Sequence, residues 1–270
     1  MATIRLSRIL FAAALIALGI TGLVNGGLAL VWQAIPLHHP PDATVIVYLC
    51  AVIELVTGVG LLLKPTVRLT CDIVFPYMLL WVVLLEIPMV VMSPLQADGW
   101  GGLGEIAIIA VGSWCLFAAH AGAKAGRLFP FAVGINGIRA ARWLLILALP
   151  MIGVEVIVDA VQMGNAILPS WLAWLPGPAY WAGLTGIGSI AAGLGMAFGI
   201  LPRLAVTMEA VMLGIITVAY WAPYLHTGRT ATTAFIISAA ITAGVWLVAD
   251  TYRSVPWLGC GRASRNIAID

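Results

Sequence analysis

The stretch TVIVYLCAVIELVTGVGLLL, residues 44–63, is mostly apolar and contains a single charged side chain, Glu54. About 20 apolar residues in a helix cross the roughly 30 Å hydrocarbon core of a bilayer. None of the apolar runs shows the short alternating segments of a membrane β-barrel. The sequence therefore predicts an all-α membrane protein with eight transmembrane helices. The seven other runs are residues 9–31, 69–91, 102–120, 142–162, 179–201, 203–222 and 231–250.

The overall composition agrees with this class. The chain has 270 residues, of which 62% are hydrophobic and only 9% are charged. A soluble domain carries about 25% charged residues, so this chain lacks the polar side chains needed to cover a globular surface. Ordinary soluble enzymes, nucleic-acid-binding proteins and disordered chains are excluded.

The basic residues predict how the helices are oriented. Of the 13 Lys and Arg residues, all except Arg229 fall on one side of the predicted helices. By the positive-inside rule, both termini are expected in the cytoplasm (N-in/C-in), in a multi-pass protein of the cytoplasmic (inner) membrane. Residues 1–25 resemble a signal peptide, but no clear cleavage site follows, and we expect this segment to remain as the first helix.

Several motifs occur twice in the same order and at a nearly constant offset. This pattern predicts two parallel four-helix repeats, which would be related by an axis along the membrane normal. The repeats are residues 1–122 and 142–253, joined by a cytoplasmic linker, 123–141, and followed by a cytoplasmic tail, 254–270. The paired motifs are Arg8, Gly19 and Asn25 with Arg142, Gly153 and Asp159; Glu54, Gly58 and Gly60 with Ser189, Gly193 and Gly195; and Arg68 and Pro88 with Arg203 and Pro223.

The repeated unit resembles the DoxX-like family of four-helix membrane proteins (DoxX/DoxD/MauE-type). The resemblance rests on the glycine-bearing segment that begins at Glu54, on the basic turn at residues 64–69, and on residues 178–205 of the second copy. It implies a redox-linked membrane protein that works beside a soluble or peripheral redox subunit, as in quinone-linked oxidation of sulfur compounds. Ser189 departs from the pattern, so only the first copy is expected to use a carboxylate at this position.

Carboxylates inside a membrane are costly and call for an explanation. Glu54 lies near the middle of its predicted helix, and four others, Glu86, Glu105, Glu155 and Asp159, lie in the outer half. For Glu54, Glu86, Glu155 and Asp159 the alternatives are catalytic proton transfer and hydrogen bonding between helices. Because Glu86 precedes Pro88 by two residues, a local backbone break there is expected to widen a cavity.

Other polar residues suggest fewer roles. Asp72, Glu209 and Asp250 lie toward the cytoplasmic ends, where a basic neighbour or solvent explains them. His226 lies close to Trp221 and Tyr224, and these three residues could bind a quinone. The outer aromatic residues otherwise suggest an interfacial belt, with a cofactor-stacking cage as the alternative. The histidines lack metal-ligand spacing, so no metal site is predicted, and the four cysteines form no obvious disulfide pair.

Three functions fit these observations. The first is the membrane subunit of a quinone-linked oxidoreductase system, with a quinone as the possible cofactor and electrons supplied by a partner subunit. The second is a membrane anchor or assembly factor without catalysis. The third is a small-molecule or proton-coupled transporter, which is disfavoured because no pair of broken helices is evident in the sequence. No hypothesis involves nucleic acid.

Overall fold

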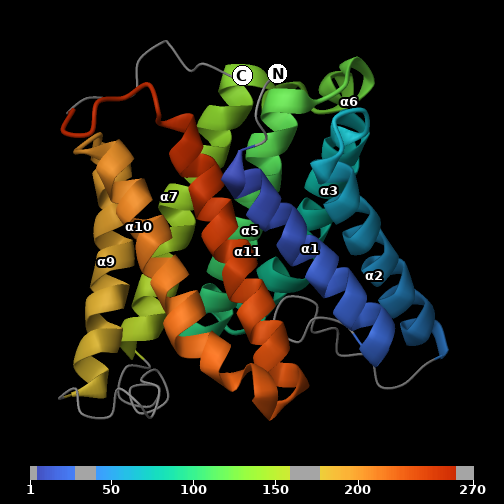
Figure 1. Cartoon of the computed structure of the whole chain (residues 1–270). Coiled ribbons are helices and arrows are strands. Elements are labelled where there is room, and N and C mark those ends of the chain that lie inside the picture. The colour runs from blue at the N-terminus through green and yellow to red at the C-terminus, as the bar shows by residue number, and fades with distance from the viewer. Residues whose placement is uncertain (1–4, 28–40, 159–176, 260–270) are drawn as a thin grey trace.

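The computed structural model of the chain describes residues 5–27, 41–158 and 177–259. Its long helices run side by side and form one bundle (Figure 1). The start of α1 and the end of α11 lie at the same end of the bundle, here called the terminal end. The elements are α1 (Leu6–Asn25), α2 (Pro41–Leu62), α3 (Val67–Trp81), η1 (Val82–Glu86), α4 (Ile87–Met92), α5 (Ala97–His120), α6 (Ala123–Leu128), η2 (Pro130–Ala132), α7 (Gly134–Val158), α9 (Pro178–Phe198), α10 (Pro202–Ile216), η4 (Thr217–Trp221), η5 (Ala222–Thr227) and α11 (Arg229–Thr251).

The described residues confirm the predicted class. They contain eight helical segments that are long and apolar enough to cross a membrane, and the chain is a multi-pass membrane protein by this criterion. Most boundaries differ from the prediction by a few residues, and two of the differences are informative. The first helix ends at Asn25, because Gly26 adopts a left-handed conformation with φ 59° and its N–H bonds to the carbonyl of Gly22. Helix α7 begins at Gly134, inside the segment predicted to be a linker.

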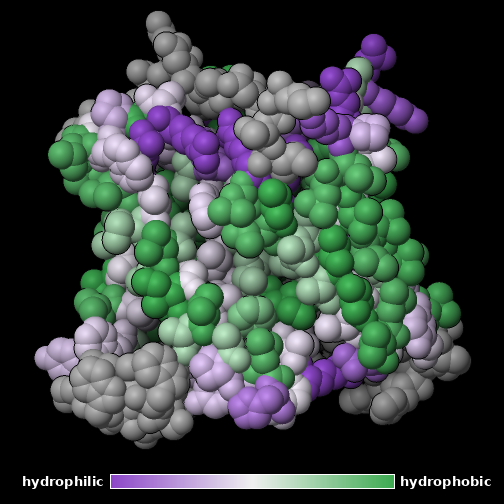
Figure 2. Space-filling model, in the orientation of Figure 1, coloured by the Kyte–Doolittle hydropathy of each residue, from purple (hydrophilic) through white to green (hydrophobic). Residues whose placement is uncertain are grey.

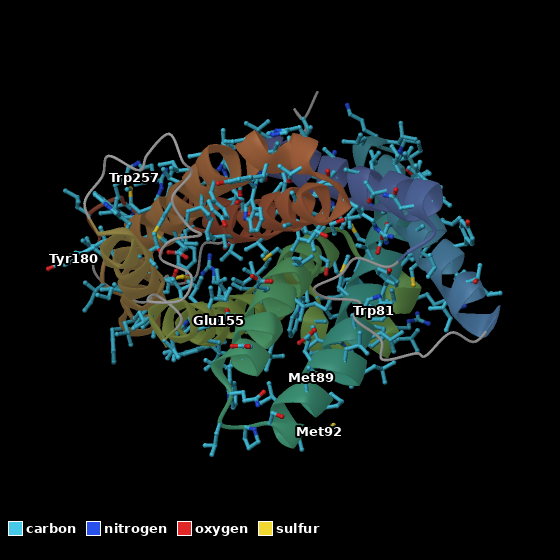
Figure 3. The ribbon with its side chains drawn as sticks, turned by 90° about the horizontal axis from the view of Figure 1, so that it is seen from below. Trp81, Met89, Met92, Glu155, Tyr180 and Trp257 are labelled. Carbon is cyan, nitrogen blue, oxygen red and sulfur yellow. The ribbon has the colours of Figure 1, made fainter. Side chains whose placement is uncertain are left out.

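The outer surface of the bundle is apolar along most of its height. Figure 2 shows a hydrophobic band between two more polar ends. Large side chains such as Leu80, Leu184 and Ile215 are more than half exposed on this band. A soluble protein would bury such a surface, so the band fits the hydrocarbon core of a bilayer. Tyr180 is exposed near the end opposite the terminal end (Figure 3), as expected for an aromatic side chain at the membrane interface.

Helices α5 and α11 form the centre of the bundle. They are the most buried of the eight membrane-spanning segments, and they contact each other directly. A Cβ atom built on Gly112 would lie 2.8 Å from the Cα of Gly244. A Cβ atom built on Gly244 would lie 2.6 Å from the carbonyl oxygen of Ile108. The two backbones can approach this closely only because both positions are glycine.

Glycines also bring the first two helices of each half of the chain together. Helix α1 crosses α2 at Gly19, where an added Cβ would lie 2.6 Å from the carbonyl oxygen of Ala51. Helix α7 crosses α9 at Gly153, where an added Cβ would lie 2.5 Å from the carbonyl oxygen of Gly186. Within the bundle, α5 packs on α7 and α11 packs on α1. Each central helix therefore contacts the first helix of the other half of the chain.

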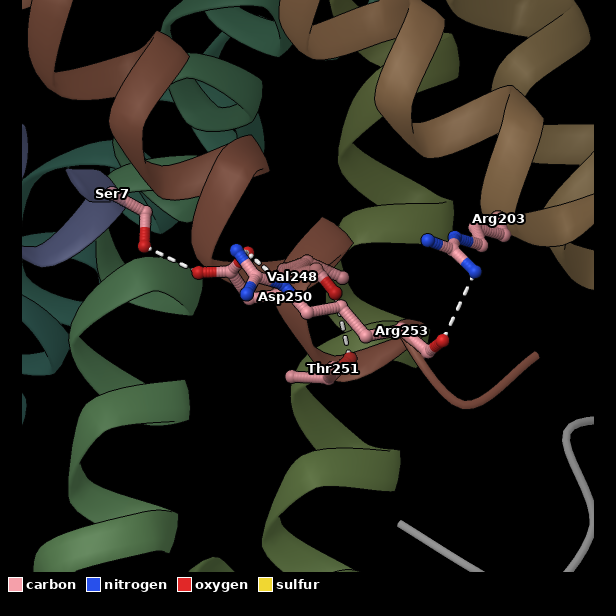
Figure 4. A network of polar contacts seen from close by, with 6 residues as sticks. All are labelled: Ser7, Arg203, Val248, Asp250, Thr251 and Arg253. Carbon is pink, nitrogen blue, oxygen red and sulfur yellow. Dashed lines mark hydrogen bonds and ion pairs between the residues drawn. The ribbon is translucent and has the colours of Figure 1, made fainter. Parts of the chain in front are cut away.

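Polar contacts close the terminal end of the bundle (Figure 4). Ser7 on α1 donates a hydrogen bond of 2.6 Å to the carboxylate of Asp250 on α11. The same carboxylate forms an ion pair with Arg253, with an N–O distance of 2.7 Å. Arg203 at the start of α10 donates to the carbonyl oxygen of Arg253 at 3.0 Å. The basic neighbour expected for Asp250 is thus present, and the end of α11 is tied to both α1 and α10.

Candidate functional site

The backbone irregularity predicted before Pro88 is present as a π-helical turn within one continuous helix, Val67–Met92. The α-helical pattern of α3 changes at η1 (Val82–Glu86) to a π-helix, and α4 follows with Pro88 in its first turn. Proline has no N–H to donate to a carbonyl of the preceding turn, so the helical hydrogen-bond pattern is disturbed at this position. Single-turn π-helices of this kind occur frequently at functional sites.

A cavity of about 720 Å³ lies beside this turn. We call it the carboxylate cavity. Its walls come from η1, α4 and α5 on one side and from α7, α10, η4 and α11 on the other. Most of the lining side chains are apolar, including Met89, Ile152, Leu213 and Ile237. The cavity therefore lies between the first and second halves of the chain, and its volume is typical of a small-molecule site.

Three glutamates reach this cavity, namely Glu86, Glu105 and Glu155. Glu86 is only 7% exposed, and its carboxylate lies against α5, where a Cβ added to Gly102 would be 3.1 Å from Oε2. A Cβ added to the adjacent Gly101 would be 1.7 Å from Oε2 of Glu155. Two glycines of α5 thus make room for carboxylates from η1 and α7, and Glu105 follows one turn later on the same helix. Figure 3 shows Glu155 as seen from the end opposite the terminal end.

The lining of the carboxylate cavity determines what it can do chemically. In the part of the chain that the structure describes, its acidic residues are Glu86, Glu105, Glu155 and Asp98, and no Lys or Arg side chain lines it. A carboxyl group in an apolar wall can accept a hydrogen bond, hold a proton or balance a cation. Within the described ranges, no group of three His, Cys, Asp or Glu side chains is placed to hold a metal ion. The cavity is therefore suited to a small organic molecule.

The other residues predicted for catalysis lie elsewhere or outside the described ranges. Glu54 is 3% exposed and accepts a hydrogen bond of 2.8 Å from the hydroxyl of Tyr77, away from the carboxylate cavity. Asp159 lies outside the described residues. Of the four predicted catalytic carboxylates, Glu86 and Glu155 come together in one cavity. Cys50, Cys71 and Cys115 are buried and free, and Cys260 is outside the described part.

The predicted quinone-binding group of Trp221, Tyr224 and His226 is only partly assembled. Trp221 lines the carboxylate cavity and also a neighbouring open pocket of about 320 Å³. Tyr224 lines the second pocket, together with Tyr220. His226 lies in η5 and lines neither of them. Trp221 is therefore the member of this group that adjoins the buried carboxylates.

One expectation from the sequence is wrong. Glu209 was expected to be explained by a basic neighbour or by solvent, but it is only 3% exposed and accepts a hydrogen bond of 2.8 Å from the hydroxyl of Ser189. Ser189 carries no carboxylate itself, but Glu209 from the next helix, α10, places one beside it. Helix α10 changes to a π-helix at η4 (Thr217–Trp221), just before Pro223, as α3 does at η1 before Pro88. Each turn lies within one continuous membrane-spanning helix, Val67–Met92 or Pro202–Thr227.

Glu105 is a site residue that the sequence did not assign. Its position in the outer half of a helix was evident, but nothing in the sequence related it to Glu86 or Glu155. Comparisons with protein families, with curated proteins and with solved structures gave no match. The carboxylate cavity is therefore the main evidence for the function of this protein.

Proposed function

We propose that this chain is an integral membrane subunit of a quinone-linked oxidoreductase system of the DoxX-like kind, and that the carboxylate cavity binds the quinone. The observation that carries this proposal is a cavity of about 720 Å³ with mostly apolar walls and three glutamates. A quinone has an apolar body and polar oxygens on its ring. Apolar residues such as Met89 and Ile237 would surround the ring, and glutamates in their protonated form would donate hydrogen bonds to its oxygens.

In quinone reduction, this chain and a partner subunit would have different roles. Reduction of a quinone to a quinol consumes a pair of electrons and a pair of protons. Glu86, Glu105 and Glu155 lie where they could transfer protons to the ring oxygens. The electrons would come from a soluble or peripheral redox subunit, whose substrate could be a reduced sulfur compound.

The proposal predicts that Glu86→Leu weakens quinone binding about fivefold, because the protonated carboxyl group would donate a hydrogen bond to a ring oxygen, leucine cannot, and a neutral hydrogen bond contributes roughly 0.5–1.5 kcal/mol. Binding of decylubiquinone to the purified protein in detergent would be measured by isothermal titration calorimetry. Glu209→Leu is the matched control, since it removes a buried carboxyl group that does not line the cavity. Equal affinities for all three proteins would contradict the proposal, as would an equal loss in both variants.

A transporter is the second candidate, and the position of the carboxylate cavity between the two halves of the chain favours it. Substrate sites at the interface between repeats are a feature of secondary transporters. The acidic lining of the carboxylate cavity would then select an organic cation. Tetraethylammonium, which crosses a protein-free bilayer only slowly, is a suitable probe, and uptake into proteoliposomes that is lost in Glu86→Gln would support transport over quinone binding. If neither quinone binding nor cation uptake is detected, a non-catalytic anchor or assembly factor becomes the better-supported function.

We also propose that the chain is a tandem duplication. The close contacts at Gly19 and Gly153 support this, since they join corresponding helices at corresponding positions. The π-helical turns η1 and η4 support it further, because each precedes one of the paired prolines, Pro88 and Pro223.

We further propose that the terminal end faces the cytoplasm, on the basis of the positive-inside rule. A green fluorescent protein fused after Asp270 is then expected to fluoresce, and alkaline phosphatase at the same position is expected to be inactive. An active phosphatase would contradict this proposal and would place the terminal end on the opposite side of the membrane.

A further inference from the structure

A second concave site lies at the terminal end of the bundle, far along α7 from the carboxylate cavity. It is a groove of about 160 Å³, here called the arginine groove. Arg139 and Arg142 line it from α7, and Tyr252 lines it from the residues that follow α11. The opposite wall is the end of α9 and the start of α10, including Gly199. Among the described residues, none of those that line it is acidic and two are arginines, so these residues give it a positive charge.

Arg142 is held in position by the protein. It is only 6% exposed, its guanidinium lies 3.7 Å from the ring centre of Tyr252, and Nε donates to the hydroxyl of Thr251 at 2.9 Å. Nη2 donates to the carbonyl oxygen of Thr251. Among the described residues no acceptor is recorded for Nη1. A guanidinium fixed in this way presents a donor to the groove without further loss of side-chain entropy.

Arg139 supplies the second charge. It precedes Arg142 by three residues on α7, so the two guanidinium groups are on the same face of the helix. Arg139 is exposed, and no ion-pair partner is recorded for it in the described part of the chain. Two arginines on one helix face match the oxygens of a phosphate group, which accept several charge-assisted hydrogen bonds.

The rest of the arginine groove is apolar and faces the membrane. Ile146 and Met196 line it on the side toward the middle of the bundle. Trp143, next in sequence to Arg142, is 54% exposed, as is typical of tryptophan at the boundary between headgroups and acyl chains. A soluble anion would leave these apolar side chains uncovered, whereas the acyl chains of a lipid would pack against them.

We propose that the arginine groove binds the phosphate group of an anionic lipid. The headgroup phosphate contacts Arg139 and Nη1 of Arg142, and the acyl chains lie along Trp143, Ile146 and Met196. Basic pockets between transmembrane helices recognise anionic lipid headgroups in the same way. The lipid would bridge α7 to the α9–α10 turn, so it would also stabilise the packing of these helices.

The test is native mass spectrometry of the delipidated protein titrated with phosphatidylglycerol. The wild type is expected to bind one molecule more tightly than the rest, and Arg139→Gln is expected to weaken this first binding step about tenfold. Arg139→Lys should retain most of the affinity, because it keeps the charge. Arg127→Gln is the matched control, since it removes an exposed charge on α6, outside the groove.

The outcomes separate the alternatives. Unchanged affinity in Arg139→Gln would overturn the proposal, and so would an equal loss in Arg127→Gln, which would indicate general attraction to a basic surface. Equal binding of phosphatidylcholine would show that the negative charge of the headgroup is not recognised. Displacement of phosphatidylglycerol by inorganic phosphate at low millimolar concentration would identify the ligand as a soluble phosphate compound and would overturn the lipid assignment.

Discussion

The Gly244→Val variant is expected to unfold at a much lower temperature than the wild type and to accumulate poorly in the membrane. Even a single Cβ at this position would lie 2.6 Å from the carbonyl oxygen of Ile108, and the opposing residue on α5 is also a glycine, Gly112. The obstacle is backbone, which cannot rotate away as a side chain can. Overpacking costs typically 1–3 kcal/mol and occasionally more. Here the two central helices would have to separate, so we expect a value at the upper end.

The apparent melting temperature in detergent, followed by intrinsic tryptophan fluorescence, measures this effect. Gly183→Val is the matched control, because Gly183 is also in a membrane-spanning helix and an added Cβ there has no neighbour within 4 Å. The control is expected to be neutral or slightly stabilising, since valine favours the helix more than glycine does. A similar loss in both variants would show that the α5–α11 contact is not the cause.

The second large effect is expected for Arg142→Met, which keeps the length of the side chain but removes its charge. The variant loses two hydrogen bonds to Thr251 and the contact with the ring of Tyr252. The carbonyl oxygen of Thr251, which is partly buried, is left without this donor. An unsatisfied buried group costs about 1–3 kcal/mol, and the lost cation–π contact adds roughly 0.5–2 kcal/mol. The C-terminal end of α11 would therefore detach from α7.

Arg139→Met provides the comparison for this prediction. Arg139 lies one turn away on the same helix but is exposed, so its replacement should leave the melting temperature nearly unchanged in lipid-free detergent. The two variants thus distinguish the structural role of Arg142 from lipid binding, which both arginines share. Equal melting temperatures for the two variants would contradict the role assigned to the Arg142–Thr251 contact.

Part of the site could be predicted from sequence because it depends on local features. A proline removes a helical N–H donor, so the irregular turn at η1 before Pro88 and the position of Glu86 beside it followed from residue spacing. The grouping of Glu86 with Glu155 and Glu105 did not. These residues come from three different segments, and their convergence depends on how closely α5 approaches its neighbours at Gly101 and Gly102.

Ser189 illustrates the same limit. Read along the chain, it marks the loss of a carboxylate from the second half. In the structure, Glu209 on the adjacent helix α10 brings a carboxylate back to the same place, 2.8 Å from the hydroxyl of Ser189. A sequence comparison by position cannot detect an exchange between two helices, because the residues are equivalent only in space.

The sequence by itself determined the all-helical class and the eight membrane-spanning segments, because each segment must satisfy its own backbone hydrogen bonds in lipid and must be long enough to cross it. These are properties of single segments. The tertiary structure decided which carboxylates share a cavity and where the arginines form a groove. Those features depend on helix rotation and on close backbone contacts at glycines such as Gly112 and Gly244, which act between segments far apart in the chain.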